Sequence, residues 1–378
     1  MKPIYLDYNA TTPMLPEVID AMTQCGFGNS SSDHDYGETA AVAIAHARQQ
    51  VADAVGCQTE EIIWTSGATE SNNLALFGAA RFYARRGRHI VTLATEHKAV
   101  LDVCQQLERE GFTVTILTPM SNGLVTIEQV RAALRPDTIL VSIMYANSEI
   151  GVIQNLQNIG QLVRAKGALM HVDAAQCVGK ISVDLKNLPV DLMSFSAHKA
   201  YGPKGIGALF VRHQPRVRLQ PLQYGGGQEQ GLRAGTLPTP LIVGMGLAFE
   251  LAKSKLDSEA PRQRELIARL WSGIRDLPGI QRNGDSTSCL PNTLNISVAG
   301  VNGAALHYAL RALALSTTSA CASSSLQPSH VLTAIGLPPQ LAHASLRFSI
   351  GRMTTTDEID RAITIVREQV LRLRELAP

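Results

Sequence analysis

The sequence lacks the features that mark several classes of protein. Its six cysteines include no C-x-x-C pair, which argues against a zinc site and a redox dithiol. No run approaches the roughly 20 apolar residues that cross a bilayer, and the N-terminal residues contain no apolar core of a signal peptide. A formal net charge of +2, with both signs interspersed, gives no electrostatic reason to expect direct binding of nucleic acid or membrane. We therefore expect a cytoplasmic protein with reduced thiols and no metal site.

The composition and the pattern of apolar residues favour a soluble α/β protein. Aromatic residues make up only 5% of the 378 residues, whereas hydrophobic residues make up 45%. Short apolar runs alternate with helical patterns through the first two thirds of the chain, at residues 62–65, 89–93, 113–117, 138–144, 168–172, 191–195 and 206–211. Strands that alternate with helices predict a largely parallel, seven-stranded sheet with helices on both faces.

The pattern changes after about residue 255 to longer helices with few strands, at 293–298 and 346–350. We expect a large domain over residues 13–255 and a smaller α+β domain formed by residues 1–12 and 256–378. A capping box from Thr355 to Glu358, followed by an apolar stripe, predicts a C-terminal helix that serves packing only.

A glycine turn connects the first of these strands to a helix. In the run Trp64-Thr-Ser-Gly-Ala-Thr-Glu70, the predicted helix opens near Thr69 and exposes backbone N–H groups at its positive end. Such an end can bind phosphate. Glycine and threonine also merely cap helices, so this turn by itself leaves both interpretations open.

An acid and a lysine follow neighbouring apolar strands. Asp173 ends the strand 168–172, and Lys199 follows the strand 191–195. Ligand sites of open parallel sheets lie at the carboxyl ends of strands, so both charges should reach one crevice. A carboxylate opposite a lysine suits pyridoxal 5′-phosphate (PLP), whose pyridine nitrogen needs an acid and whose aldehyde needs an amine. A structural ion pair is the alternative.

Further polar residues could contribute to a site formed around Asp173 and Lys199. His97 follows the strand 89–93 and could either cap a helix or stack on a cofactor ring and exchange protons. Ser196 and His198, next to the lysine, could donate to a phosphate. The glycines at 225–227 and the residues 233–236 form a loop that could approach another phosphate oxygen or a neighbouring subunit, or could simply be flexible.

Cys321 differs from the other cysteines in its surroundings. It lies in the run 316–325 of small residues, which can neither pack a core nor hold a rigid helix. We expect it on an exposed, mobile segment. The other five cysteines fit the role of small buried hydrophobes.

Several motifs together resemble one known family over essentially the full length of the chain. They are residues 5–13 (YLDYNATTP), 66–71 (SGATES), 95–98 (TEHK), 171–176 (HVDAAQ), 194–205 (SFSAHKAYGPKG), 233–236 (RAGT), 319–321 (SAC) and 347–352 (RFSIGR). In these motifs the chain resembles the NifS/IscS-type cysteine desulfurases, which are class V aminotransferases of PLP fold type I.

The resemblance implies roles for individual residues. PLP would bind covalently to Lys199, with Asp173 at the pyridine nitrogen and His97 stacked over the ring. The phosphate would be held by Ala68, Thr69, Ser196 and His198, and the ring oxygen would lie near Gln176, Asn147 and Ser148, where the family usually has asparagine at position 148. Thr236 would reach the phosphate site of the partner in a homodimer. Arg347 would bind the substrate carboxylate in a pocket lined by Asn9 and Asn29.

The resemblance also implies an activity. L-Cysteine would lose its sulfur to Cys321, giving L-alanine and an enzyme persulfide for a sulfur-acceptor protein. The acceptor could serve iron–sulfur assembly, tRNA thiolation, cofactor sulfuration or DNA sulfur modification, and the end of the chain at Pro378 disfavours the first. A selenocysteine lyase, a class V aminotransferase and a non-catalytic PLP-fold subunit are the alternatives.

Overall fold

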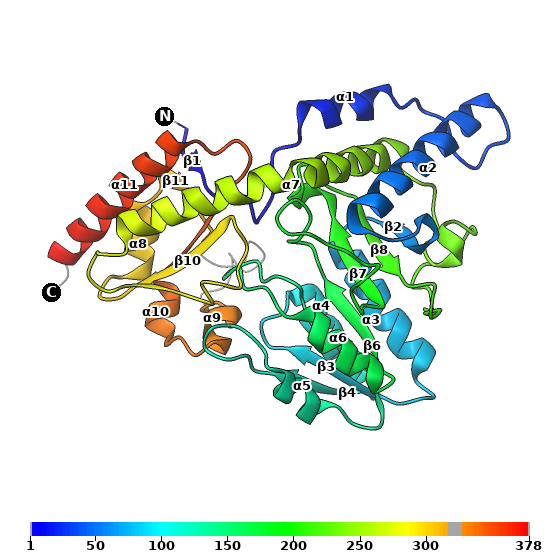
Figure 1. The fold of residues 1–378 in the computed structure, drawn as a ribbon, viewed down its shortest axis with the longest axis horizontal. Helices are drawn as coiled ribbons and strands as arrows, with labels where there is room; N and C mark the ends of the chain where they lie inside the picture. Colours follow the sequence, from blue (N-terminus) through cyan, green and yellow to red (C-terminus); the bar gives the residue numbers. More distant parts are fainter. Residues whose placement is uncertain (1, 317–326, 377–378) are drawn as a thin grey trace.

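A seven-stranded sheet forms the centre of the N-terminal two thirds of the chain (Figure 1). The structure is a computed structural model that describes residues 2–316 and 327–376. The strands lie in the order β2-β8-β7-β6-β5-β3-β4, and all run parallel except β8, which is antiparallel to both neighbours. Their bounds are Ile62–Thr65 (β2), His89–Leu93 (β3), Thr113–Leu117 (β4), Thr138–Ser142 (β5), Leu169–Asp173 (β6), Leu192–Ser196 (β7) and Gly207–Val211 (β8).

Helices cover both faces of this sheet. On one face lie α3 (Ala68–Tyr83) and α4 (Lys98–Arg109), which share a core cluster with the strands. The other face packs against α2 (Asp35–Val55), α5 (Ile127–Ala133), α6 (Leu156–Ala165) and the first half of α7 (Thr239–Ile274). Helix α1 (Pro16–Gln24) packs against α7, and short 3-10 turns occur at Thr59–Glu61 (η1), Ala197–Lys199 (η2) and Glu229–Gly231 (η3).

The C-terminal third builds a second set of sheets on the other half of α7 (Figure 1). An antiparallel sheet has the order β12-β10-β9, and the N-terminal strand β1 pairs in parallel with β11. The strands are Ile4–Tyr5 (β1), Ile280–Arg282 (β9), Thr293–Val298 (β10), Leu313–Ala314 (β11) and Ser345–Ser349 (β12). The helices are Gly303–Ala309 (α8), His330–Ala334 (α9), Pro339–His343 (α10) and Thr356–Glu375 (α11).

The α/β fold expected from the sequence is confirmed. Each of the seven predicted apolar runs forms a strand of the large sheet. All of these strands except β4 are wholly or almost wholly buried, which explains why their sequences are continuous apolar runs. Helix α2 begins six residues before the predicted residue 41, because His34 caps a first turn that is too polar to show the apolar period. Helix α11 starts at the predicted capping box of Thr355 and Glu358.

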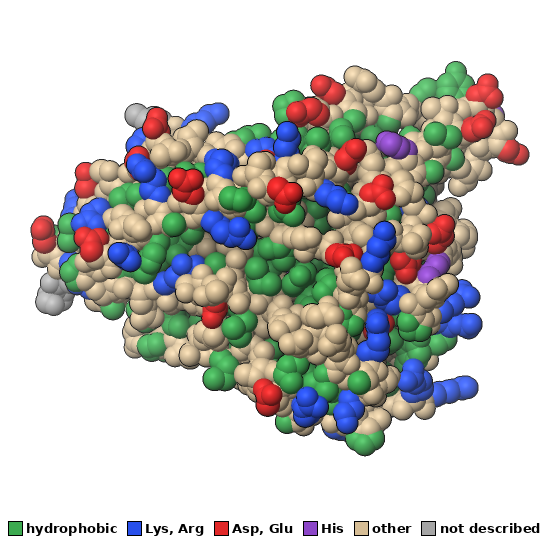
Figure 2. Space-filling model, viewed as in Figure 1, with side chains coloured by type: hydrophobic (Ala, Val, Ile, Leu, Met, Phe, Trp, Pro, Cys, Tyr) green, Lys and Arg blue, Asp and Glu red, His purple; other side chains and the backbone are tan. Residues whose placement is uncertain are grey.

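The face of the molecule drawn in Figure 2 carries charges of both signs. Figure 2 shows basic and acidic side chains interspersed over the face that includes α7 and α11, as the net charge of +2 suggests. Within the described part of the chain, no helix combines the length and apolar character needed to cross a membrane.

Candidate active site

Five parallel strands end at the same edge of the large sheet and open a cavity of about 420 Å³. The segments that follow β2, β3, β5, β6 and β7 supply most of its wall, as expected for an open parallel sheet. The N-terminal segment and β12 supply the rest. The cavity brings together eleven of the residues predicted from the sequence: Asn9, Ala68, Thr69, His97, Ser148, Asp173, Gln176, Ser196, His198, Lys199 and Arg347.

One end of the cavity is formed by the start of helix α3. Its N-cap residue is Gly67, no side chain caps the helix, and Gly67, Ala68 and Thr69 all line the cavity. The side chain of Glu70 accepts from the backbone N–H of Ser66 at 2.7 Å and pairs with Arg233 at 2.8 Å. The loop that follows η3 is thus held against the start of α3. A helix start of this kind can bind an anion.

Asp173 lines the cavity from the end of β6, with only 8% of its surface exposed. Its Oδ2 accepts from the amide of Asn72 at 2.7 Å, and its Oδ1 accepts from the backbone N–H of Ala175 at 2.9 Å. Two donors therefore fix the carboxylate with its charge directed at the cavity. A cationic ring nitrogen is the natural partner for a carboxylate held in this way.

The two histidines of the cavity are held in the neutral form. His97 caps helix α4, because its Nδ1 accepts from the backbone N–H of Ala99 at 3.1 Å, which places the ring proton on Nε2. Burial lowers the pKa of His97; the charge of Asp173 opposes this shift, and that of Lys199 adds to it. Burial followed by repulsion from Lys199 and Lys204 lowers the pKa of His198 to about 4. Both rings can thus take part in proton or hydrogen-bond exchange without carrying charge at neutral pH.

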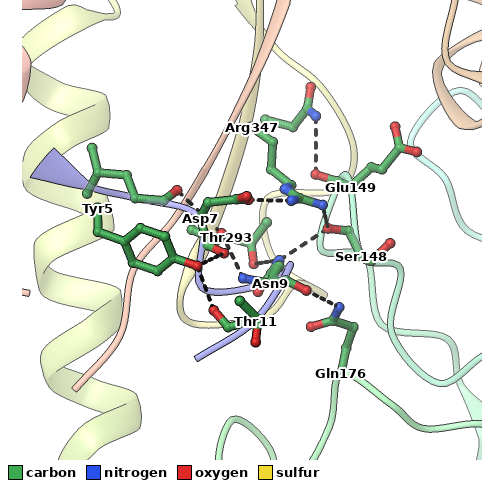
Figure 3. Close-up of polar contacts among 12 residues, drawn as sticks. Tyr5, Asp7, Asn9, Thr11, Ser148, Glu149, Gln176, Thr293 and Arg347 are labelled. Atoms are coloured by element: carbon green, nitrogen blue, oxygen red, sulfur yellow. Dashed lines mark hydrogen bonds and ion pairs between the residues drawn. The ribbon is translucent and has the colours of Figure 1, made fainter. Parts of the chain in front are cut away.

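Arg347 projects from β12 toward the N-terminal segment (Figure 3). Its side chain is 4% exposed, and it forms an ion pair of 2.5 Å with Asp7 and donates to the carbonyl of Ser148 at 3.1 Å. Its buried Nε has no hydrogen-bond partner in the described structure. Because Arg347 also lines the cavity, its guanidinium is suited to binding an incoming carboxylate.

Asn9 links Arg347 to the rest of the cavity. Its amide donates to the carbonyl of Ser148 at 3.2 Å and to Thr293 at 2.9 Å, and its carbonyl accepts from Gln176 at 2.9 Å (Figure 3). The N-terminal segment is therefore part of the site, although it precedes the large sheet in the sequence.

Three predicted residues lie outside the cavity. Asn29 is exposed in the loop before α2, so the expectation that it shares the pocket with Asn9 fails within one chain. The amide of Asn147 points into its own turn, where it accepts from the backbone N–H groups of Glu149 and Ile150 and donates to Thr95. Thr236 is exposed and lines a separate, open hollow with the glycines 225 and 226. Cys321 lies outside the described residues.

The structure adds residues that the sequence analysis missed. Asn72 fixes Asp173, Lys180 contacts both Gln176 and Asn9, and Lys204 lines the cavity. Asn72 could have been suspected as a polar residue on a helix face that is otherwise apolar. Lys180 gives no such signal, because a single lysine in a turn normally lies at the surface.

The donor set fits PLP. The helix end suits a phosphate, the fixed Asp173 suits a protonated pyridine nitrogen, and Lys199 lines the same cavity. No group of three or more metal-ligating side chains occurs in residues 2–316 and 327–376.

Comparison with known proteins agrees with this geometry. Residues 4–362 match the family described as Aminotransferase class-V, and the chain belongs to that family, whose members depend on PLP. Within it, the chain is 57% identical to "Cysteine desulfurase IscS" of Aeromonas hydrophila, over 100% of this chain and 95% of the relative. It belongs to the cysteine desulfurases.

Two solved structures are similar over most of the chain. A "NIFS-LIKE PROTEIN" superposes with a TM-score of 0.91 at 37% identity, covering 98% of this chain and 100% of the other. A structure titled "SspA in complex with cysteine" superposes with a TM-score of 0.81 at 39% identity, covering 92% and 98%.

Proposed function

We propose that this chain is a PLP-dependent enzyme that moves the sulfur of L-cysteine onto Cys321, releases L-alanine, and passes the sulfur to an acceptor protein. The observation that carries the proposal is that Asp173, His97, Lys199 and Arg347 all line one cavity. The cysteine-bound structure of the relative SspA supports the choice of substrate.

The cavity offers a place for each part of the cofactor. When bound, PLP withdraws electrons from the substrate carbons and so makes their protons and bonds labile. We assign the covalent bond to Lys199, the pyridine nitrogen to Asp173 and the face of the ring to His97. The remaining contacts are assigned to Ala68, Thr69, Ser196, His198, Gln176 and Ser148, with Thr236 reaching the site of a partner subunit.

The chain's own residues would then act on the substrate. Arg347, which lines the cavity, binds the carboxylate through its guanidinium and orients the amino acid. Lys199 takes the proton from Cα, and the neutral His97 accepts a proton from a thiol and returns one to the product. The Cys321 thiolate forms an S–S bond with Sγ while the Cβ–Sγ bond breaks, and its electron pair stays on carbon, which is protonated to give alanine.

We further propose a large domain at residues 13–255 and a smaller one at residues 1–12 and 256–378. The separate core clusters of the large sheet and of the C-terminal sheets support this division. A homodimer with shared sites is proposed because Thr236 is exposed and Arg233, close to it in sequence, pairs with Glu70 in the first turn of α3. A cytoplasmic location is proposed as well. The destination of the sulfur, in iron–sulfur assembly, tRNA thiolation or DNA modification, is set by the acceptor protein.

A Cys321→Ser variant tests the proposal. The hydroxyl is a much weaker nucleophile toward sulfur, but the cavity residues are unchanged. The variant should keep its bound PLP and its spectral response to cysteine, while alanine formation falls by about two orders of magnitude or more. Cys104→Ser, at a buried thiol of the α4 core, is the matched control and should retain activity.

Mass spectrometry locates the sulfur. Wild-type protein treated with cysteine in the absence of reductant should carry an added sulfur on the peptide that contains Cys321. An added sulfur on another cysteine, or near-normal alanine formation by Cys321→Ser, would show that the nucleophile is misassigned.

A further inference from the structure

A lysine lies buried behind the active-site cavity. Lys180 belongs to the turn that follows β6, and only 6% of its surface is exposed. Its ammonium group donates to Oε1 of Gln176 at 2.5 Å and to Oδ1 of Asn9 at 3.3 Å. Both acceptors belong to residues that line the cavity.

The charge of Lys180 has no carboxylate partner among the described residues. Its two hydrogen-bond acceptors are neutral amides, and none of the ion pairs of the described structure includes it. The charged groups that face it are also cationic, namely Lys199 from η2 and Arg347 from β12, while burial keeps the thiol of Cys177 neutral by raising its pKa. An uncompensated buried cation is costly, so such a site favours an anion nearby.

Lys180 also determines how two amides are oriented. An ammonium group only donates, so it can contact only the oxygen side of each amide. The oxygen of Gln176 therefore turns toward Lys180, and its NH₂ group turns toward the carbonyl of Asn9 and the cavity. The oxygen of Asn9 also accepts from Asn292 at 3.0 Å, which leaves its NH₂ group for Ser148 and Thr293.

We propose that Lys180 is a positioning residue that fixes Gln176 as a hydrogen-bond donor to the cavity and supplies a positive charge behind it. This arrangement tunes the site for an anionic oxygen on the cofactor ring. The inference deepens the proposed function and rests on it. Burial, with repulsion from Lys199 and Arg347, lowers the pKa of Lys180 to about 7, and an anion in the cavity would restore its charge.

Two substitutions separate the two effects of Lys180. Lys180→Gln removes the charge but keeps a donor for the oxygen of Gln176, whereas Lys180→Met removes both. A positive charge disfavours protonation of the nearby Lys199 nitrogen. Both variants should therefore raise, by about one unit, the pH at which the visible absorption band of the PLP-loaded protein titrates. Only Lys180→Met should also lose PLP several-fold faster on dialysis. In that variant no donor holds the oxygen of Gln176, so its amide group can rotate and present the oxygen to the cavity.

The control is Lys186→Met, at an exposed lysine six residues further along, which should leave both the titration and the rate of PLP loss unchanged. If Lys180→Met does not fold, Lys180→Gln still tests the charge. A titration midpoint that stays at the wild-type value in every folded variant would overturn the role of Lys180 while leaving the enzyme assignment intact. Wild-type protein that develops no visible band with PLP would instead overturn the proposed function, and this inference with it.

Discussion

Arg347 illustrates how a residue can be held ready for a ligand by its own chain. Asp7 and the carbonyl of Ser148 take two of its nitrogens, and Nε is left buried without a partner. A buried donor without a partner costs about 1–3 kcal/mol, which an incoming carboxylate can recover. Because Nε is buried, a carboxylate in the cavity reaches it only if the guanidinium shifts.

The substitution Arg347→Lys tests this role. A lysine keeps the positive charge but loses the planar pair of donors, so we expect KM for cysteine to rise about tenfold, equivalent to about 1.4 kcal/mol, with a smaller change in kcat. Steady-state alanine formation at varied cysteine measures both constants. Arg269→Lys, in an exposed ion pair with Asp360, serves as the control. An unchanged KM in Arg347→Lys would contradict carboxylate binding at this residue.

The sequence predicts those site residues that directly follow a strand. It does not predict those whose role depends on being buried in the folded protein. Asp173, His97 and Lys199 follow apolar runs, so the topology of a parallel sheet is enough to bring them to one edge. Lys180 owes its role to burial behind the cavity, which no local pattern encodes. Asn29 lies elsewhere in the chain because its position depends on a loop, whose path local sequence does not fix.

At the scale of elements, the strands are predictable and the longest helix is not. The seven runs of the large sheet are short, apolar and separated by turns, so each is recognisable alone. Helix α7 extends over 36 residues, and Pro261 in its interior would normally indicate the end of a helix. It continues because its two halves are held by packing against different cores.

Contact between β8 and the turn before α3 yields a second prediction. A Cβ on Gly207 would lie 2.5 Å from the carbonyl oxygen of Phe195 and 2.6 Å from Cα of Gly67. Both are backbone atoms, so Gly207→Ala must displace the turn at the cavity. We expect a loss of about 1–3 kcal/mol in the free energy of unfolding and several-fold weaker retention of PLP.

Urea unfolding and dialysis measure the two effects. Ala208→Gly, at the next residue of β8, weakens the strand without approaching Gly67 and should reduce stability while PLP is retained. Equal loss of PLP in both variants would contradict the prediction that the contact with Gly207 fixes the position of the turn at Gly67.

At the scale of the whole molecule, stability should depend on acid through a buried histidine. His171 lies in β6 between the hydroxyls of Ser142 and Ser194, at 2.8 and 3.2 Å. Burial lowers its pKa to about 4, whereas an unfolded chain would have about 6.5. Between pH 6.5 and pH 4 the histidine binds a proton in the unfolded chain but not in the folded chain. The free energy of unfolding that is present above pH 6.5 is therefore lost as the pH falls toward 4.

The expected loss is about 3 kcal/mol between these two pH values. Urea midpoints of the wild type at pH 7 and pH 4.5 should differ strongly, and His171→Asn should reduce the difference. His46→Gln, at an exposed histidine of α2, should leave it as in the wild type. A pH dependence that is the same in His171→Asn would assign the acid sensitivity to other groups.

The length of α7 limits how the molecule can flex. Its 36 residues correspond to about 54 Å of unbroken helix. Its buried side chains enter the core of the large sheet at Ile242, Met245 and Phe249 and the C-terminal core at Leu266, Leu270 and Ile274. The two cores are therefore joined by a stiff rod, and a rotation of one against the other has to bend that rod. Bending costs least at Pro261, which lies between the two anchored stretches and lacks an N–H for the helical ladder.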